Sequence, residues 1–261
     1  MSRAATPTDL RGEGVLGAEL RRLDLELVAR GLARSRAQAQ EMISGGGVRV
    51  DGVVARRAAS RVDATSVLEA SADHYVSRAA HKLAGALDDL GLAVPSRALD
   101  AGASTGGFTQ VLLERGCRQV IAVDVGTDQL AERLRTDPRV RSWPQTNLRD
   151  LTLAHVEGVP VDLVVADVSF ISLTLLVAPL LGVTAANGEL LLLVKPQFEV
   201  GRERLSSSGV VRDEELRREA VDGVVGSAEL HGWTAAAVVP SRIRGAAGNT
   251  EVFVLLRRRG R

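Results

Sequence analysis

The chain has 261 residues, of which 45% are hydrophobic and 25% charged, and its formal net charge is +1. This composition suits a globular protein of one large or two modest domains, and no run of about 18 apolar residues predicts a membrane span. The single cysteine, Cys117, excludes an internal disulfide and an all-cysteine zinc site, and we predict no metal site. Residues 1–9 lack the apolar core of a secretory signal, so we expect a cytoplasmic protein.

The basic residues are unevenly distributed and are almost all arginine. Residues 18–62 contain nine arginines and five acidic residues, which indicates either a polyanionic partner or an ordinary solvated face. Only two of the 33 basic residues are lysines, Lys82 and Lys195. Arginine cannot share or lose a proton because its pKa stays above roughly 12. We therefore expect the two lysines to carry chemistry, although two surface lysines could also remain by chance.

The N-terminal part of the chain predicts a short tail followed by two helices. Residues 1–17 are rich in glycine and polar residues, so we expect them to be disordered. Apolar residues recur at helical spacing over residues 20–28. Ser35 can cap a second helix that runs to about Ser44.

A small sheet is expected next. Residues 48–54 are two β-prone runs around Asp51-Gly52, a pair that strongly favours a hairpin turn. Residues 67–69 add a further strand. Together with the two helices, these strands predict a compact α+β domain over residues 18–71.

Three segments of this domain resemble the S4-like RNA-binding domain: Arg22-Leu23-Asp24, residues 33–39 and residues 47–52. The resemblance implies that arginines beside the second helix and in the hairpin face a folded RNA. Guanidinium groups suit this task because they bind phosphate oxygens in pairs. The candidate RNA-binding residues are Arg21, Arg22, Arg34, Arg36, Arg49, Arg56 and Arg57.

After a linker at residues 72–76, residues 77–261 predict a second, larger domain. Continuous apolar runs that end in a polar residue alternate with helical stretches, which indicates an α/β fold with a mostly parallel, Rossmann-like sheet covered on both faces. Trp143 and Trp233 are expected in its core. The predicted strands are residues 98–100, 120–124, 161–167, 189–194, 233–239 and 251–256, and the predicted helices begin at Ser77, Phe108 and Gln129.

A glycine-rich segment follows the first of these strands and opens a helix. Gly102, Gly106 and Gly107 allow the backbone to approach a ligand at the strand end. The segment has neither the dinucleotide-binding glycine spacing nor the Gly-Lys-Ser/Thr of a P-loop, and a plain strand–helix turn is the alternative. Asp124 ends the next strand, where an acid can accept both ribose hydroxyls of an adenosine.

This arrangement resembles S-adenosylmethionine-dependent methyltransferases. The resemblance implies that Gly102 and its neighbours contact the methionine part, Asp124 the ribose and residues 147–150 the adenine. The candidate cofactor-binding residues are Asp100, Gly102, Ala103, Ser104, Gly106, Gly107, Phe108, Asp124, Val125, Asn147, Leu148 and Asp150.

The methyl acceptor must be inferred from the other polar residues. Methylation of a cytosine carbon needs a cysteine nucleophile, and Cys117 begins a strand far from the usual positions. Methylation of a base nitrogen usually shows Asn/Asp-Pro-Pro-Tyr, where this chain has Asp167-Val168-Ser169-Phe170. Both alternatives are therefore weakened.

A ribose hydroxyl is a poor nucleophile unless its proton is removed or shared, and an amine tuned by a second amine and by carboxylates can do this. Taken singly, each acid could be a surface or capping carboxylate, but their occurrence with the two lysines favours a reactive group. The candidate catalytic residues are Lys82, Asp167, Lys195 and Glu251.

This Lys-Asp-Lys-Glu order resembles the FtsJ-type ribose 2′-O-methyltransferases, and a wider set of segments over about residues 18–257 resembles the TlyA family. Residues 242–245, Arg-Ile-Arg-Gly, depart from that family, whose members often have proline and fewer charges there. The segments that carry the resemblance are residues 77–83, 100–108, 166–172, 194–199, 209–212 and 248–251.

The resemblance implies transfer of a methyl group from S-adenosyl-L-methionine to cytidine 2′-hydroxyls of 16S and/or 23S ribosomal RNA in ribosomal subunits. It also implies that Lys195 is the proton acceptor or steering amine, with Lys82, Asp167 and Glu251 holding its charge state and the hydroxyl. Two alternatives are a catalytically silent RNA-binding or assembly factor and a membrane-lytic haemolysin. The apolar stretch at residues 174–183 is too short to span a membrane, and Pro179 interrupts it.

Overall fold

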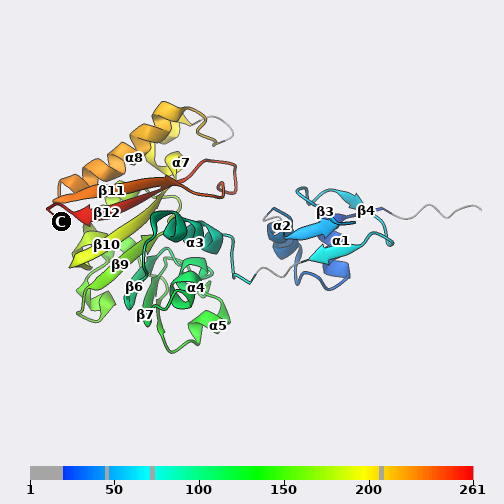
Figure 1. Ribbon diagram of the computed structural model, residues 1–261, viewed down its shortest axis with the longest axis horizontal. Helices are drawn as coiled ribbons and strands as arrows, with labels where there is room; N and C mark the ends of the chain where they lie inside the picture. Colours follow the sequence, from blue (N-terminus) through cyan, green and yellow to red (C-terminus); the bar gives the residue numbers. More distant parts are fainter. Residues whose placement is uncertain (1–19, 45–46, 71–73, 206–208, 261) are drawn as a thin grey trace, which may run out of the picture. The chain divides into compact units, whose positions relative to one another are not determined.

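The chain divides into two compact units, Met1–Asp73 and His74–Arg261 (Figure 1). The computed structural model describes residues 20–44, 47–70, 74–205 and 209–260. The tail predicted over residues 1–17 lies outside the described residues, as do residues 72 and 73 of the predicted linker.

The first unit has the helices and the hairpin expected from the sequence. Asp51 and Gly52 have φ values of 50° and 78°, which is the left-handed conformation that a two-residue hairpin turn requires. The Ser35 hydroxyl accepts a hydrogen bond from the Gln38 amide at 3.2 Å and so caps the second helix. The elements are β1 (Arg21–Arg22), α1 (Leu23–Ala29), α2 (Arg36–Ser44), β2 (Val48–Val50), β3 (Val53–Val54), β4 (Arg61–Val62) and β5 (Leu68–Ala70).

A buried carboxylate links the helices of this unit. Asp24 is fully buried, and its two oxygens accept hydrogen bonds from Arg22 at 2.9 and 3.0 Å. Arg36 and Gln40, both on α2, also donate to it at 2.9 Å. These contacts, those of Arg22 above all, hold the pKa of Asp24 well below its usual range. The charge of Asp24 is thus satisfied from both α1 and α2, next to a small apolar core that includes Leu23 and Leu27.

Replacing Asp24 with Asn should destabilise the first unit by about 2 kcal/mol, because hydrogen bonds to a charged group are lost in a buried place. The lowered pKa means that this stabilisation is present above the ordinary range of an Asp and is lost as the pH falls into strong acid. Hydrogen exchange of the α1 and α2 amides in the full chain measures the effect. Glu69→Gln, which removes an exposed charge from β5, is the matched control, and equal effects of the two variants would contradict the prediction.

The second unit is built on a seven-stranded sheet in the order β11-β12-β10-β9-β6-β7-β8. The five strands from β10 to β8 are mutually parallel, and β12 is antiparallel to both of its neighbours. This confirms the predicted, mostly parallel α/β fold. The strands are β6 (Arg97–Ala101), β7 (Gln119–Val123), β8 (Val140–Trp143), β9 (Val161–Ala166), β10 (Thr184–Val194), β11 (Trp233–Pro240) and β12 (Val252–Arg258).

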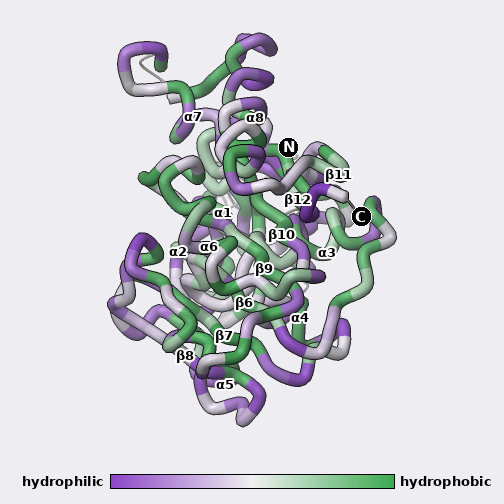
Figure 2. Tube along the Cα trace, turned by 90° about the vertical axis from the view of Figure 1, so that its left-hand side faces the viewer, coloured by the Kyte–Doolittle hydropathy of each residue, from purple (hydrophilic) through white to green (hydrophobic). Residues whose placement is uncertain are grey.

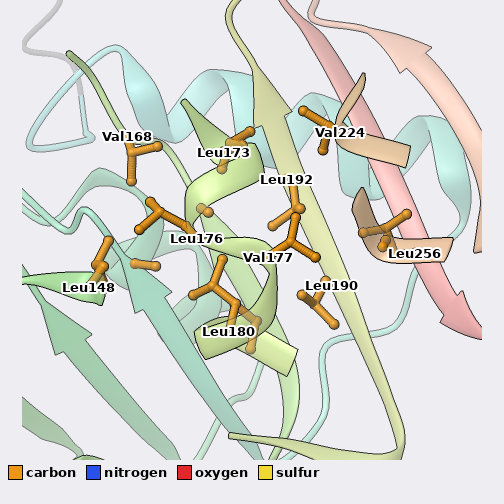
Figure 3. Close-up of a cluster of buried hydrophobic side chains, with 14 of the residues drawn as sticks. Leu148, Val168, Leu173, Leu176, Val177, Leu180, Leu190, Leu192, Val224 and Leu256 are labelled. Carbon is orange, nitrogen blue, oxygen red and sulfur yellow. The ribbon is translucent and has the colours of Figure 1, made fainter. Parts of the chain in front are cut away.

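Helices cover both faces of this sheet because each face buries an apolar layer. On one face, α3 and α4 pack Leu83 and Leu112 against the strands. On the other, α6 and α8 pack Leu180 and Val224 against Leu192 and its neighbours (Figure 3). Hydropathy follows this arrangement, with hydrophobic residues along the strands and hydrophilic residues at the outer turns (Figure 2). The α-helices are α3 (Ala79–Leu90), α4 (Gly107–Glu114), α5 (Glu132–Arg135), α6 (Val177–Gly182), α7 (Pro196–Glu199) and α8 (Glu214–Glu229).

Some details differ from the sequence-based expectation. The edge strand β8 and the long helix α8 were not predicted, and α5 is confined to Glu132–Arg135. Trp143, on β8, is 38% exposed and meets His155 edge to face, so its predicted core position is wrong. Its strand lies at the sheet edge, where one side stays open. Trp233 is buried as expected.

Helices of the described residues are all too short or too polar to cross a membrane.

Candidate active site

The four predicted catalytic residues and the glycine-rich loop meet at the edge of the sheet where the parallel strands end. The glycine-rich loop at residues 102–106, the predicted cofactor loop, follows β6, Asp167 follows β9, and Lys195 follows β10. In the antiparallel pair of β10 and β12, Val194 lies opposite Val252, so Lys195 and Glu251 are the next residues in register. The fold therefore brings segments that are distant in sequence to one place.

A cavity of about 580 Å³ opens at this edge. Its volume lies in the range of about 300–1,000 Å³ that is usual for ligand and cofactor sites. It is lined by several of the predicted cofactor-binding residues and by one predicted catalytic residue, Asp167. The lining includes Gly102, Ser104, Asp124, Val125, Asn147, Leu148, Asp167, Ser169 and Phe170.

The backbone at Gly102 explains why the loop needs glycine there. Its φ is 85°, and a Cβ atom would lie 2.8 Å from the carbonyl oxygen of Asp167. Ser104 also has a positive φ, 46°, and its amide donates to Asp124 Oδ2 at 2.8 Å. The amide of Gly126 donates to Asp124 Oδ1 at 2.7 Å. Asp124 thus holds the loop, and each of its oxygens has a further lone pair for a ligand hydroxyl.

The other glycines of the loop pack helices. A Cβ atom at Gly107 would lie 2.3 Å from Ser77 Oγ, and one at Gly106 would lie 2.4 Å from Leu134 Cδ1. Gly107 thus lets the start of α3 pack closely against the start of α4, and Gly106 leaves room for Leu134. Ser77 is not the cap of α3 that the sequence predicts: the helix begins at Ala79, and the residue before it is Arg78, with no side-chain capping hydrogen bond.

Three of the predicted cofactor-binding residues, Ala103, Phe108 and Asp150, do not line the main cavity. Phe108 is buried and stacks on Phe253 at 6.2 Å, and Asp150 is exposed outside the cavity lining. Ala103 lines a smaller cavity of about 210 Å³, which shares Ser104 and Asp124 with the first.

Asp100 lies fully buried at the end of β6. Burial raises its pKa to about 7, against a hydrogen bond from Thr109 at 2.7 Å, and the charges of Asp167 and Asp124 raise it further. Its Oδ1 atom has no hydrogen-bond partner among the described residues. Asp124 and Asp167 both line the cavity, and the carboxylate of Asp167 is paired with Lys195.

The four predicted catalytic residues form two ion pairs. Lys82 Nζ, on α3, lies 2.7 Å from Glu251 Oε2, and both residues are buried. Lys195 Nζ lies 2.6 Å from Asp167 Oδ1, and it also donates to Ser169 Oγ at 2.9 Å. Both lysines of the chain are thus paired with a carboxylate at this edge of the sheet.

Sequence reasoning did not assign a role to the residues that follow Asp167. Ser169 and Phe170 line the cavity, and the Phe170 side chain is 92% exposed. Its ring lies 5.3 Å from that of Phe198, which in turn lies 6.0 Å from Lys195 Nζ. Their place directly after a strand-end acid is the signal that could have indicated them.

Two structural residues were also missed. Glu199, at the end of α7, accepts hydrogen bonds from Ser172 Oγ at 2.5 Å and from the Leu173 amide at 2.9 Å, while burial raises its pKa. Asn249, two residues before Glu251, is buried. It accepts from the Val211 amide at 2.8 Å and so joins two loops beside Glu251.

The arginines predicted to bind RNA fall into two groups. Arg22 and Arg36 are bonded to the buried Asp24, and Arg49 donates to the Gly52 carbonyl at 2.9 Å. These three arginines have a role inside the first unit, although each guanidinium has further donors.

The second group is exposed. Arg34, Arg56 and Arg57 have no side-chain hydrogen bond or ion pair to any other described residue, and Arg21 lies 4.0 Å from Glu26. Arginines of this second group are available to an anionic partner without breaking a strong internal contact.

The described residues contain no group of three or more His, Cys, Asp or Glu side chains that could hold a metal ion.

The chain is similar to known proteins over both units. The S4 domain matches residues 21–68, and the FtsJ-like methyltransferase domain matches residues 75–258. The chain is 50% identical over 240 residues to the 16S/23S rRNA (cytidine-2'-O)-methyltransferase TlyA of Mycobacterium tuberculosis, covering 90% of this chain and 89% of the relative. It is 38% identical over 233 residues to Hemolysin A of Brachyspira hyodysenteriae, covering 88% of this chain and 97% of the relative.

A solved structure from Streptococcus thermophilus, which carries a hemolysin name, has a TM-score of 0.72 to this chain. The two are 35% identical, and the match covers 92% of this chain and 89% of that chain.

Gly102→Ala should weaken binding of S-adenosylmethionine by about 10-fold or more, because the added methyl group forces the loop away from Asp167. Isothermal titration of the purified chain measures the affinity. Gly116→Ala is the matched control, since Gly116 also has a positive φ, 93°, but no atom within 4 Å of the added methyl group. If both variants bind the cofactor alike, the close approach at Gly102 does not matter for binding.

Proposed function

Because the chain belongs to the TlyA family, in which an S4 domain precedes an FtsJ-like methyltransferase domain, we propose that it methylates the 2′-hydroxyl of cytidine in 16S and/or 23S ribosomal RNA. S-adenosylmethionine, when bound, supplies the methyl group. The observation that carries the proposal is the two ion pairs at this edge of the sheet: Lys195–Asp167, whose aspartate lines the cavity, and Lys82–Glu251.

The geometry of Lys195 supports a hydroxyl acceptor. As the ribose oxygen bonds to the methyl carbon, the hydroxyl proton must leave. Lys195 can accept that proton while its own proton passes to Asp167 Oδ1, which is 2.6 Å away. Asp167 then holds the added proton and the lysine keeps its charge. The Lys82–Glu251 pair, from α3 and the residue before β12, sets the electrostatic environment of this transfer.

The proposed cofactor site is the 580 Å³ cavity. Gly102 and Ser104 would face the methionine part, Asp124 the ribose, and Asn147 and Leu148 the adenine. Gly106, Gly107 and Phe108 would act indirectly, by fixing the start of α4.

The proposed partner is ribosomal RNA within ribosomal subunits. An S4 domain with exposed arginines supports it, because guanidinium groups bind phosphates without depending on sequence. The exposed ring of Phe170 at the cavity suits stacking on an unpaired base, which is how proteins commonly hold single nucleotides of RNA. A cytoplasmic location follows from this substrate and is part of the proposal.

Lys195→Arg should lower the turnover number by about 100-fold or more, since arginine keeps the positive charge but cannot relay a proton. Transfer of labelled methyl groups from S-adenosylmethionine to purified 30S and 50S subunits measures it, with the labelled nucleotide identified by mass spectrometry. The affinity for S-adenosylmethionine should stay within about two-fold of the unaltered chain. Label on a base instead of a ribose, or near-normal turnover of Lys195→Arg, would overturn the assignment.

The double variant Arg56→Ala/Arg57→Ala should weaken binding to ribosomal subunits and reduce the slope of log affinity against log salt by about 1 to 2, because each lost phosphate contact removes about one released counterion. Filter binding at several salt concentrations measures the slope. Arg61→Ala is the control, since Arg61 is an exposed arginine of the same unit that donates to the Leu20 carbonyl. An unchanged slope in the double variant would remove these arginines from the RNA-binding surface.

The alternatives make different predictions in the same experiments. A silent RNA-binding or assembly factor would bind subunits without transferring label. A membrane-lytic protein would release dye from liposomes, which an RNA methyltransferase has no reason to do.

A further inference from the structure

The loop between β9 and the short helix η3 (Leu173–Leu175) carries the residues that face the cavity beside Lys195. Lys195 and the helix that follows it, α7, contact this loop at its beginning, its middle and its end. Lys195 contacts Asp167 and Ser169, and the Phe198 ring lies 5.3 Å from the Phe170 ring. At the end of the loop, Glu199 accepts hydrogen bonds from Ser172 and Leu173.

The conformation of this loop is strained. Phe170 has a φ of 64°, a left-handed conformation that costs a residue with a side chain roughly 1–2 kcal/mol. Phe170 is 92% exposed, so burial of this residue does not offset that strain. A strained residue of this kind persists only where the surrounding structure fixes both ends of its segment. Lys195 fixes one end through Asp167 and Ser169, and Glu199 fixes the other.

Glu199 has the geometry of such a fixing group. One carboxylate oxygen accepts from the Leu173 amide at 2.9 Å, the other from Ser172 Oγ at 2.5 Å. Ser172 Oγ also accepts from the Thr174 amide at 3.2 Å and so caps η3. Glu199 itself does not line the cavity. It therefore reaches the reaction only through the loop.

We propose that Glu199 is a positioning residue for the RNA acceptor: it locks residues 169–173 in the strained conformation that presents Ser169 and Phe170 to the target nucleotide. This inference rests on the proposed function. Glu199 and Asp124 therefore have different roles, because Asp124 holds the glycine-rich loop after β6 through the Ser104 amide. Loss of Glu199 should accordingly disturb alignment of the acceptor and leave cofactor binding intact.

The test uses the full chain, S-adenosylmethionine and whichever ribosomal subunit the unaltered chain methylates. Glu199→Ala removes both acceptor oxygens, and kcat/KM for the subunit should fall by up to about 100-fold, the effect of a misplacement of about 1 Å. Glu199→Gln keeps one oxygen for the Leu173 amide, so it should recover part of the loss. The affinity for S-adenosylhomocysteine should stay within about two-fold in both variants.

Asp137→Asn is the matched control, because Asp137 also accepts from a backbone amide, that of Arg139 at 2.9 Å, but lines neither cavity. Its kinetics should equal those of the unaltered chain. Normal kcat/KM in Glu199→Ala, or an equal loss of cofactor affinity, would overturn the positioning role.

A second measurement does not depend on methyl transfer. Hydrogen exchange at the Leu173 and Thr174 amides should speed up in Glu199→Ala, while exchange in the sheet strands stays unchanged. If the unaltered chain methylates neither subunit, the proposed function fails, and the exchange rates still decide whether Glu199 locks the loop. Unchanged exchange at Leu173 would show that it does not.

Discussion

The parallel arrangement of β6, β9 and β10 is the constraint on which the site depends. Parallel strands end at one edge of a sheet, so the loop after β6, Asp167 after β9 and Lys195 after β10 have to meet there. β12 runs in the opposite direction, and its beginning lies at the same edge. This reversal is what allows Glu251, the residue before β12, to join a site that is otherwise built from strand ends.

Charge satisfaction then decides which side chains can occupy this edge. A buried ion is stable only when it is paired, and both lysines have a carboxylate within 2.7 Å. Elsewhere the chain uses arginine for its ion pairs, as in the contact of Arg242 with Asp89 at 2.6 Å. Arginine suffices there because only charge and geometry are needed. At Lys195 a lysine fits the proposed proton transfer, which an arginine could not carry out.

The sequence predicts what depends on residue type and local pattern. The Asp51-Gly52 hairpin follows from backbone preference, and the proposed catalytic roles of Lys82 and Lys195 follow from the rarity of lysine. It does not predict what depends on distant partners. A glycine pattern cannot tell a ligand approach from helix packing, as at Gly107. Likewise, an arginine near a basic patch gives no sign that it turns inward, as Arg22 does toward Asp24.

The two loops that line the cavity are held in the same way. Each carries a loop in which a residue with a side chain has a positive φ, Ser104 at 46° and Phe170 at 64°. Each loop is held by a carboxylate that accepts a hydrogen bond from a backbone amide of the loop. Asp124 does this for the first loop and Glu199 for the second. Because these carboxylates come from different segments, after β7 and in α7, strain on one side need not pass to the other. The two loops therefore have separate anchors, although both line one cavity.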